Sequence, residues 1–212
     1  MSALSPAAQQ LASHFIDVCR VAYDPRTTND ERHRAIASME AMFQPPPRSQ
    51  CSHDVSSALL AIAFHPNSAS PEACSAALGQ LSSLLRRGVL PPQAVPLASL
   101  ISAIAQQGMA VPRIVLAGWC QTAAVAAVMG GWLGEGGCEN WLDLVCPTDL
   151  HQSPATLMAL ECFVAACGDE STELEHVGHE ARHAIRRAFA KAAPELLRRV
   201  VATAGQLFHR YN

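Results

Sequence analysis

Apolar residues recur at helical spacing along most of the chain, and prolines, glycines and small polar residues interrupt them at short intervals. Near the start, Leu11, Phe15 and Val18 follow one another at three or four positions, which is the spacing of one face of an α-helix. We expect this helix from about Pro6 to Tyr23, because the Asp24-Pro25 pair that follows predicts a turn.

The clearest helix boundaries lie in the second quarter of the chain. Ser70 can accept hydrogen bonds from the first amides of a helix, and Pro71 fits the first helical turn without losing a bond. Arg86 and Arg87 complement the negative end of the helix dipole, and Gly88 suits the left-handed cap. The residues between these signals are therefore predicted to form one helix.

The same signals predict about ten helices in the whole chain and no strong β-strand. They are expected at residues 6–23, 30–43, 54–64, 71–87, 92–107, 112–129, 139–145, 154–168, 172–191 and 194–208. Taken as pairs, they repeat about every 40 residues, the period of HEAT and armadillo arrays. The predicted fold is therefore all-α, a single domain over residues 1–212 built as an α-solenoid of about five HEAT-like helical pairs. A compact helical bundle is the alternative.

Composition supports helices and limits the partners. Half of the residues are hydrophobic but only 5% are aromatic, so alanine, leucine and valine supply most of the apolar mass, which favours helices over sheets. The formal net charge of -3 provides no basic field for a nucleic-acid backbone. We therefore expect no direct nucleic-acid ligand.

The cysteines and the first residues of the chain indicate an intracellular protein. None of the eight cysteines forms a C-x-x-C pair, so zinc-ribbon and redox motifs are not predicted. Cys74 and Cys162 lie within helical apolar patterns, where a reduced thiol behaves as a small hydrophobic side chain. Residues 1–10 lack the pattern of a secretory signal. The expected location is the cytoplasm and the nucleus.

One segment has the length of a membrane-spanning helix. No charged residue occurs from Ile114 to Leu133, and about 20 apolar residues span a bilayer. However, Gln121 and Thr122 lie near its middle, and Gly130 indicates that the helix ends there. A helix buried on all sides inside a soluble stack is the favoured interpretation, so no membrane insertion is expected.

The residues His179-Glu180-Ala181-Arg182-His183 match H-E-x-x-H, in which two histidines one turn apart hold zinc and the glutamate activates water. Arg186 occupies the position where the longer metalloprotease motif requires glycine. Glu195 is the only later carboxylate, and it would reach the histidines only through a tight helical hairpin. We therefore expect no catalytic residue, no metal site and no cofactor. A zinc-dependent peptidase remains the less favoured alternative.

The three tryptophans, Trp119, Trp132 and Trp141, lie near the middle of the chain. They are expected to anchor packing between neighbouring repeats.

Three stretches together resemble importin-β-type nuclear transport receptors, the karyopherins. The run Leu116–Trp141 is similar to their third repeat region. The stretch Ala159–Ala202, with an acidic turn at Asp169-Glu170, resembles the transportin-SR and importin-13-like branch. The first helical pair, with Tyr23-Asp24-Pro25 leading into Met39, looks like the opening repeat of that branch.

This resemblance implies a function. It implies a right-handed stack of HEAT repeats corresponding to the N-terminal portion of such a receptor, which binds the GTP form of the small GTPase Ran and a cargo protein. No residue matches a Ran-contact motif, so the binding residues stay unassigned. The predicted function is a protein-binding module of nucleocytoplasmic import, without enzymatic activity. A helical-repeat scaffold or adaptor unrelated to transport is the alternative.

Overall fold

The computed structural model describes residues 4–43, 53–64, 69–107, 110–130, 154–168 and 179–211. These residues form eight α-helices and one short 3₁₀-helix, and no β-strand occurs among them. In chain order they are α1 (Pro6–Tyr23), α2 (Asn29–Met42), α3 (His53–Phe64), α4 (Pro71–Arg86), η1 (Pro92–Ala94), α5 (Leu97–Gln107), α6 (Arg113–Met129), α8 (Pro154–Gly168) and α9 (His179–Tyr211). The all-α prediction is confirmed. The helix predicted at residues 139–145 lies outside the described residues.

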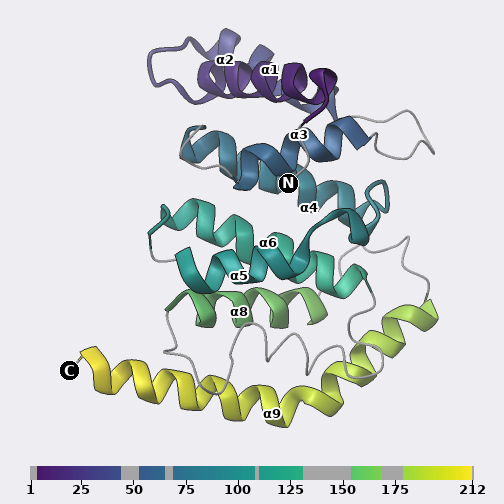
Figure 1. Cartoon of the computed structure of the whole chain (residues 1–212), viewed down its shortest axis with the longest axis vertical. Helices are drawn as coiled ribbons and strands as arrows, with labels where there is room; N and C mark the ends of the chain where they lie inside the picture. The colour runs from purple at the N-terminus through teal and green to yellow at the C-terminus, as the bar shows by residue number, and fades with distance from the viewer. Residues whose placement is uncertain are drawn as a thin grey trace.

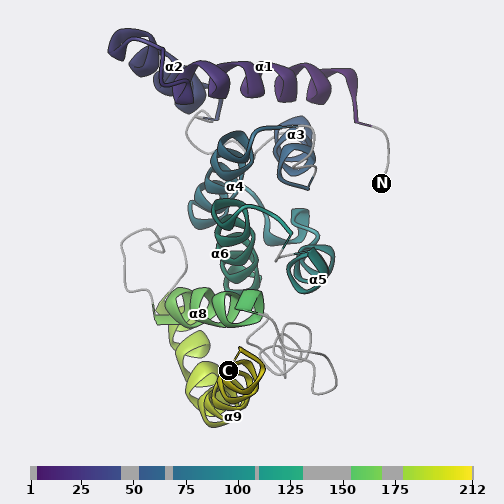
Figure 2. The ribbon, with the colours of Figure 1, turned by 90° about the vertical axis from the view of Figure 1, so that its left-hand side faces the viewer.

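The helices form successive layers along the long axis of the molecule (Figure 1). The pair α1 and α2 lies at one end, followed by α3 with α4, then α5 with α6, then α8, and α9 lies at the other end. Figure 2 shows α3 and α5 on one side of the stack and α4 and α6 on the other. The main packing contacts join each layer to the next, above all α4 to α6 and α6 to α8.

Local chemistry explains where several helices begin and end. The Ser5 and Ser70 hydroxyls accept hydrogen bonds from the amides three residues on, as predicted for Ser70. The helix predicted at residues 30–43 is α2, and Thr28 is its N-cap. The Thr28 side chain accepts from the Glu31 amide, and the Glu31 carboxylate accepts from the Thr28 amide. This reciprocal capping box satisfies two amides at the start of α2.

The helix α4 ends as its sequence predicts. Gly88 has a φ of 66°, a left-handed conformation that favours glycine. The Val89 amide donates to the Leu84 carbonyl over 3.0 Å, and the Gly88 amide donates to the Leu85 carbonyl over 2.9 Å. These two bonds satisfy carbonyls that the end of the helix leaves without partners.

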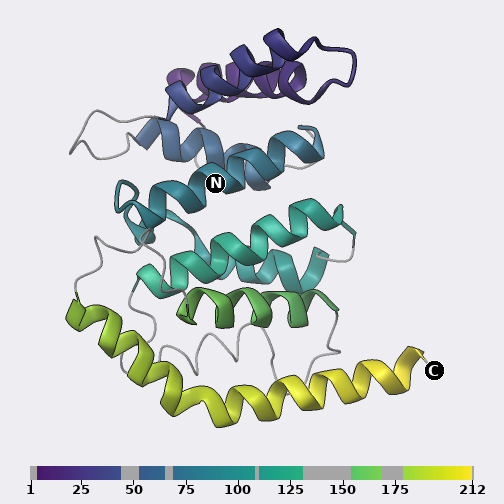
Figure 3. The same ribbon diagram turned by 180° about the vertical axis from the view of Figure 1, so that it is seen from behind.

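Two prolines act differently from their predicted roles. The expected helix 92–107 is interrupted, because Pro96 has no amide hydrogen and separates η1 from α5. In contrast, Pro194 does not start a new helix. It lies inside the continuous helix α9, so the predicted pair 172–191 and 194–208 is wrong. Figure 3 shows α9 bent near its middle, with both halves rising toward the stack, as expected for a proline within a helix.

The helix α6 lies in the centre of the stack and is buried along most of its length, including Val115, Trp119 and Val125. This burial explains why no charged residue occurs from Ile114 to Met129. The prediction of a helix buried on all sides holds only in part, because Ile114 and Gln121 are exposed, and residues 131–133 lie outside the described residues. Within the described part of the chain, no helix combines the length and the apolar character needed to cross a bilayer.

Polar contacts and one close approach fix α6 against its neighbours. The Trp119 indole donates to the Ala63 carbonyl at the end of α3 over 2.9 Å. The Ser82 and Thr122 hydroxyls are buried 3.0 Å apart between α4 and α6. Gly118 faces Leu78, and a Cβ atom at Gly118 would lie 2.8 Å from the Leu78 Cδ1 atom. The absence of a side chain there lets α4 and α6 pack closely.

Candidate interaction surface

The H-E-x-x-H residues lie in the first two turns of α9, with His179 and His183 four positions apart on the same helix. The side chain of His179 lies outside the described part of the structure. Among the side chains that are described, no group of three or more His, Cys, Asp or Glu residues is placed to hold a metal ion.

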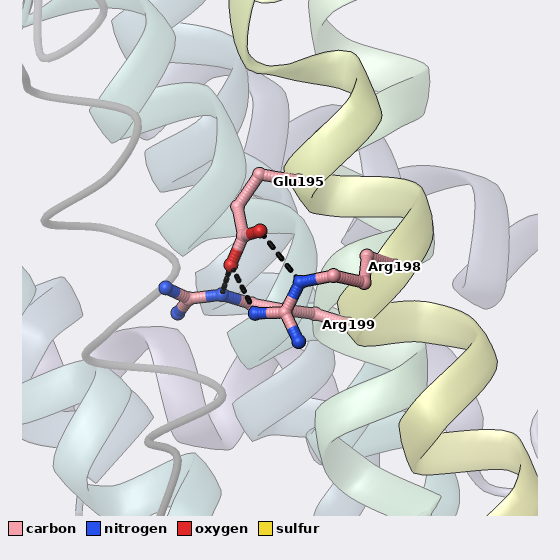
Figure 4. Close-up of polar contacts among 3 residues, drawn as sticks. All are labelled: Glu195, Arg198 and Arg199. Carbon is pink, nitrogen blue, oxygen red and sulfur yellow. Dashed lines mark hydrogen bonds and ion pairs between the residues drawn. The ribbon is translucent and has the colours of Figure 1, made fainter.

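Glu195 is held by two arginines on its own helix (Figure 4). The Arg198 guanidinium donates to both carboxylate oxygens over 2.7 and 2.8 Å, and the Arg199 Nε atom donates to one of them over 2.7 Å. The hydrogen bonds from Arg198 and Arg199 lower the pKa of the Glu195 carboxyl to about 2. The carboxylate therefore stabilises α9 locally at neutral pH.

The continuous course of α9 also separates Glu195 from the histidines. The hairpin that would have returned Glu195 to His183 does not form, because both residues belong to one helix. Twelve residues of helix correspond to about 18 Å at 1.5 Å per residue. Glu195 is therefore too far along the helix to complete a zinc site with His183.

A polar hollow of about 300 Å³ opens between α4 and α6. Its lining residues are Gly79, Ser82, Ser83, Arg86, Arg87 and Gln121. None of these described lining residues is a carboxylate, a histidine or a thiol, the side chains that most often act as a general base or an activated nucleophile. The hollow offers hydrogen-bonding groups and arginine side chains.

A second, more open groove of about 370 Å³ lies between α1 and α2. Val18, Val21 and Ala35 provide its apolar lining, and its polar lining residues are His14, Asp17, Glu31 and Arg34. Both acids already have partners. Asp17 pairs with the Arg20 guanidinium at 3.1 Å, and Glu31 belongs to the capping box of α2. The groove is a surface depression with an apolar floor and charged residues that are engaged within α1 and α2.

The described cysteines act as core side chains. Cys19, Cys74 and Cys120 are buried and form no disulfide, as predicted for reduced structural thiols. Burial raises the pKa of the Cys19 and Cys120 thiols to about 12, from an ordinary value of 9.0. A nucleophilic cysteine requires the opposite shift, because the thiolate is the reactive form.

The most unusual surface among the described residues is an exposed apolar face of α9. Leu197, Val201 and Phe208 are 64%, 63% and 67% exposed, more than any other large apolar side chain among the described residues. A terminal helix of a stack normally presents a polar outer face. Sequence reasoning missed this surface, although the spacing of these three residues was a visible signal.

Trp119 fulfils its predicted anchoring role, since it is 1% exposed and bridges α6 and α3. Trp132 and Trp141 lie outside the described residues. The fold and surfaces define an all-α protein of layered helices with exposed apolar surface at one end. Comparisons with protein-family models, with curated proteins and with solved structures found no match.

Proposed function

We propose that this chain is a protein-binding module whose helical layers act as a HEAT-like repeat array. The observation that supports this proposal best is the order of the layers. The main packing contacts of each layer are with its neighbours, from α1 and α2 at one end to α9 at the other. An array of this kind exposes long helical surfaces, which suit large protein interfaces.

The polar hollow and the apolar groove support the same proposal. Both are open to solvent and formed by pairs of helices, α4 with α6 and α1 with α2. The polar hollow is lined by no carboxylate, histidine or thiol among the described residues, and both carboxylates of the apolar groove are engaged, Asp17 by Arg20 and Glu31 by the capping box of α2. The proposal therefore gives the chain a binding role and no enzymatic role.

The narrower form of the proposal is a module of nuclear import that binds Ran-GTP and a cargo protein in the cytoplasm and nucleus. Its support is the resemblance carried by Tyr23-Asp24-Pro25, by residues 116–141 and by residues 159–202, together with the layered helices. A helical scaffold or adaptor outside nuclear transport is the alternative within the same class.

The test is a binding titration of the purified chain with Ran loaded with a non-hydrolysable GTP analogue, with Ran-GDP as the control. Selective binding of the GTP form is expected for the transport module. Equal or absent binding of both forms would refute that module and leave the scaffold. Zinc content, measured on the same sample, tests the H-E-x-x-H alternative, because a peptidase requires one bound zinc per chain.

The broader proposal needs a test that does not depend on Ran. The immobilised full chain is expected to retain specific proteins from an extract of its native cells, and each candidate is then purified and titrated against the chain. If no retained protein binds in the purified system, the protein-binding proposal fails in both its forms.

A further inference from the structure

The helix α9 has two apolar faces, and the contacts among the described residues join one of them to the stack. Ala192 and Leu196 are buried in the core, and Phe189 and Val200 pack against it. These residues recur at helical spacing on one face, which contacts α8. Leu197, Val201 and Phe208 lie on a different face, because successive helical residues differ by about 100°.

The second face has the spacing of a helix-pairing seam. Its residues are Ala190, Pro194, Leu197, Val201, Ala204 and Phe208, all exposed. We call these six residues the outer seam. Their separations alternate between four and three positions, which is the a and d pattern of a coiled coil. An apolar seam with this period fits the side of another α-helix better than a flat surface or a small molecule.

Charge gives the outer seam a preferred partner. The residues of α9 include seven arginines and lysines but only two glutamates, whereas residues 1–178 include eight basic and sixteen acidic residues. Lys191 and Arg198 are exposed and directly follow the seam residues Ala190 and Leu197, so they lie along one edge of the seam. Acidic residues on a docked helix would complement this edge.

Two other occupants fit less well. An antiparallel pair of α9 helices from two copies would bring the Lys191 and Arg198 edges together, and like charges across such an edge are unfavourable. Membrane binding of a helix scales with the apolar area that it buries, and only three of the six seam residues, Leu197, Val201 and Phe208, are large apolar side chains.

We propose that the outer seam of α9 binds an amphipathic α-helix of a partner protein, with apolar residues at the same heptad spacing and acidic residues facing Lys191 and Arg198. This inference rests on the proposed protein-binding function and adds the surface and the chemistry of the partner. It does not depend on Ran, whose binding is measured separately.

The probe is a synthetic peptide of about four heptads, with leucine at the a and d positions and glutamate at the e and g positions. Repulsion among its glutamates keeps this peptide largely unfolded alone, so binding to α9 is expected to increase its helical circular dichroism. The full chain is titrated into the fluorescent peptide, and anisotropy reports the dissociation constant. A second peptide with lysine in place of glutamate is the charge control.

Variants of the chain locate the binding site. The double variant Leu197→Ser/Val201→Ser is expected to weaken binding at least about tenfold, because apolar anchors dominate such interfaces. These side chains are exposed, so the fold should persist, and circular dichroism checks this. Ile114→Ser is the matched control, since Ile114 is 51% exposed on α6, and it is expected to leave binding unchanged.

The variant Lys191→Glu tests the charge edge. It is expected to weaken binding of the glutamate peptide about threefold or more and to strengthen binding of the lysine peptide, because charge complementarity reverses. A purely structural role of Lys191 would not produce this reversal.

Four outcomes would overturn the inference. The first is that the glutamate peptide does not bind at about 100 µM, a concentration at which even a weak complex would form. The second is that both peptides bind with equal affinity, and the third is that Ile114→Ser weakens binding as much as the double variant. The fourth is that another molecule occupies the seam. This fourth outcome would be seen as a dimer of the chain in solution or as its sedimentation with phosphatidylserine vesicles. In either case the Leu197→Ser/Val201→Ser variant would abolish the association. Loss of Ran binding with peptide binding intact would refute only the transport proposal.

Discussion

The indole N–H of Trp119 donates to the backbone carbonyl of Ala63 over 2.9 Å, and this bond joins residues 56 positions apart. Ala63 lies in the last turn of α3, where carbonyl groups have no partner within the helix. A side chain of α6 thus completes the end of α3. The same helix end receives the Cys74 thiol, 3.4 Å from the Ile62 carbonyl.

Replacing this tryptophan should therefore destabilise the stack. In Trp119→Phe the Ala63 carbonyl loses its donor and a small cavity forms, so we expect the unfolding free energy to fall by about 2–3 kcal/mol. Urea denaturation measures this change. Ile114→Val, on the exposed side of the same helix, should change the value by less than about 0.5 kcal/mol. Similar effects of both variants would contradict the assigned role of the indole.

Two helical glycines should respond in opposite directions to alanine. A Cβ at Gly118 would lie 2.8 Å from the Cδ1 atom and 3.1 Å from the Cβ atom of buried Leu78, whereas nothing lies within 4 Å of a Cβ at Gly79. We expect Gly118→Ala to destabilise the protein by about 1–3 kcal/mol because of overpacking. Gly79→Ala should stabilise it by about 0.5–1 kcal/mol through helix propensity. Thermal unfolding of both variants distinguishes them, and stabilisation by Gly118→Ala would refute the close approach.

The buried hydroxyl pair predicts non-additive substitutions. The Thr122 hydroxyl lies 3.0 Å from the Ser82 hydroxyl and donates to the Leu78 carbonyl over 3.3 Å. Thr122→Val alone leaves the Ser82 hydroxyl buried without this partner and should cost about 1–3 kcal/mol. The double variant Ser82→Ala/Thr122→Val should lower the unfolding free energy by less than the sum of the two single substitutions. A double-mutant cycle by denaturation measures the coupling, and strict additivity would argue against the pair.

The buried thiols predict a loss of stability at alkaline pH. Because the folded-state pKa values of Cys19 and Cys120 are raised to about 12 from 9.0, the stabilisation is complete below pH 9. It is lost as the pH rises from 9 toward 12, at up to about 1.4 kcal/mol per thiol and pH unit. Denaturation between pH 8 and 11 tests this. In Cys120→Ala the unfolding free energy should fall less steeply with pH than in the unmodified chain. An equally steep fall would show that Cys120 does not contribute.

The proline within α9 predicts a stabilising substitution. Pro194 removes one backbone hydrogen bond of the helix and clashes with the preceding turn. Pro194→Ala should therefore raise the unfolding free energy by about 1–3 kcal/mol and increase the helical circular dichroism signal. Pro71→Ala is the control, because Pro71 occupies the first turn of α4, where proline is well tolerated. A loss of stability in Pro194→Ala would mean that packing of α9 on α8 requires the bend.

Local chemistry along the chain determined which segments are helical and where many of them end. Ser70 and Gly88 act through neighbouring backbone groups, so their effect on α4 was visible without a structure. Tertiary packing decided what local rules leave open. Pro194 remains within α9, where residues on both sides of it, such as Ala192 and Leu196, are buried in the core.

The tertiary structure also decided which apolar residues are buried. Leu196 and Leu197 are equally hydrophobic neighbours, yet Leu196 is 5% exposed and Leu197 is 64% exposed. Hydrophobic spacing predicts that a helix has an apolar face, but it does not say how many faces find a partner. The layered packing places one face of α9 on α8 and leaves the outer seam exposed, because contacts between distant segments rather than local sequence select the buried face.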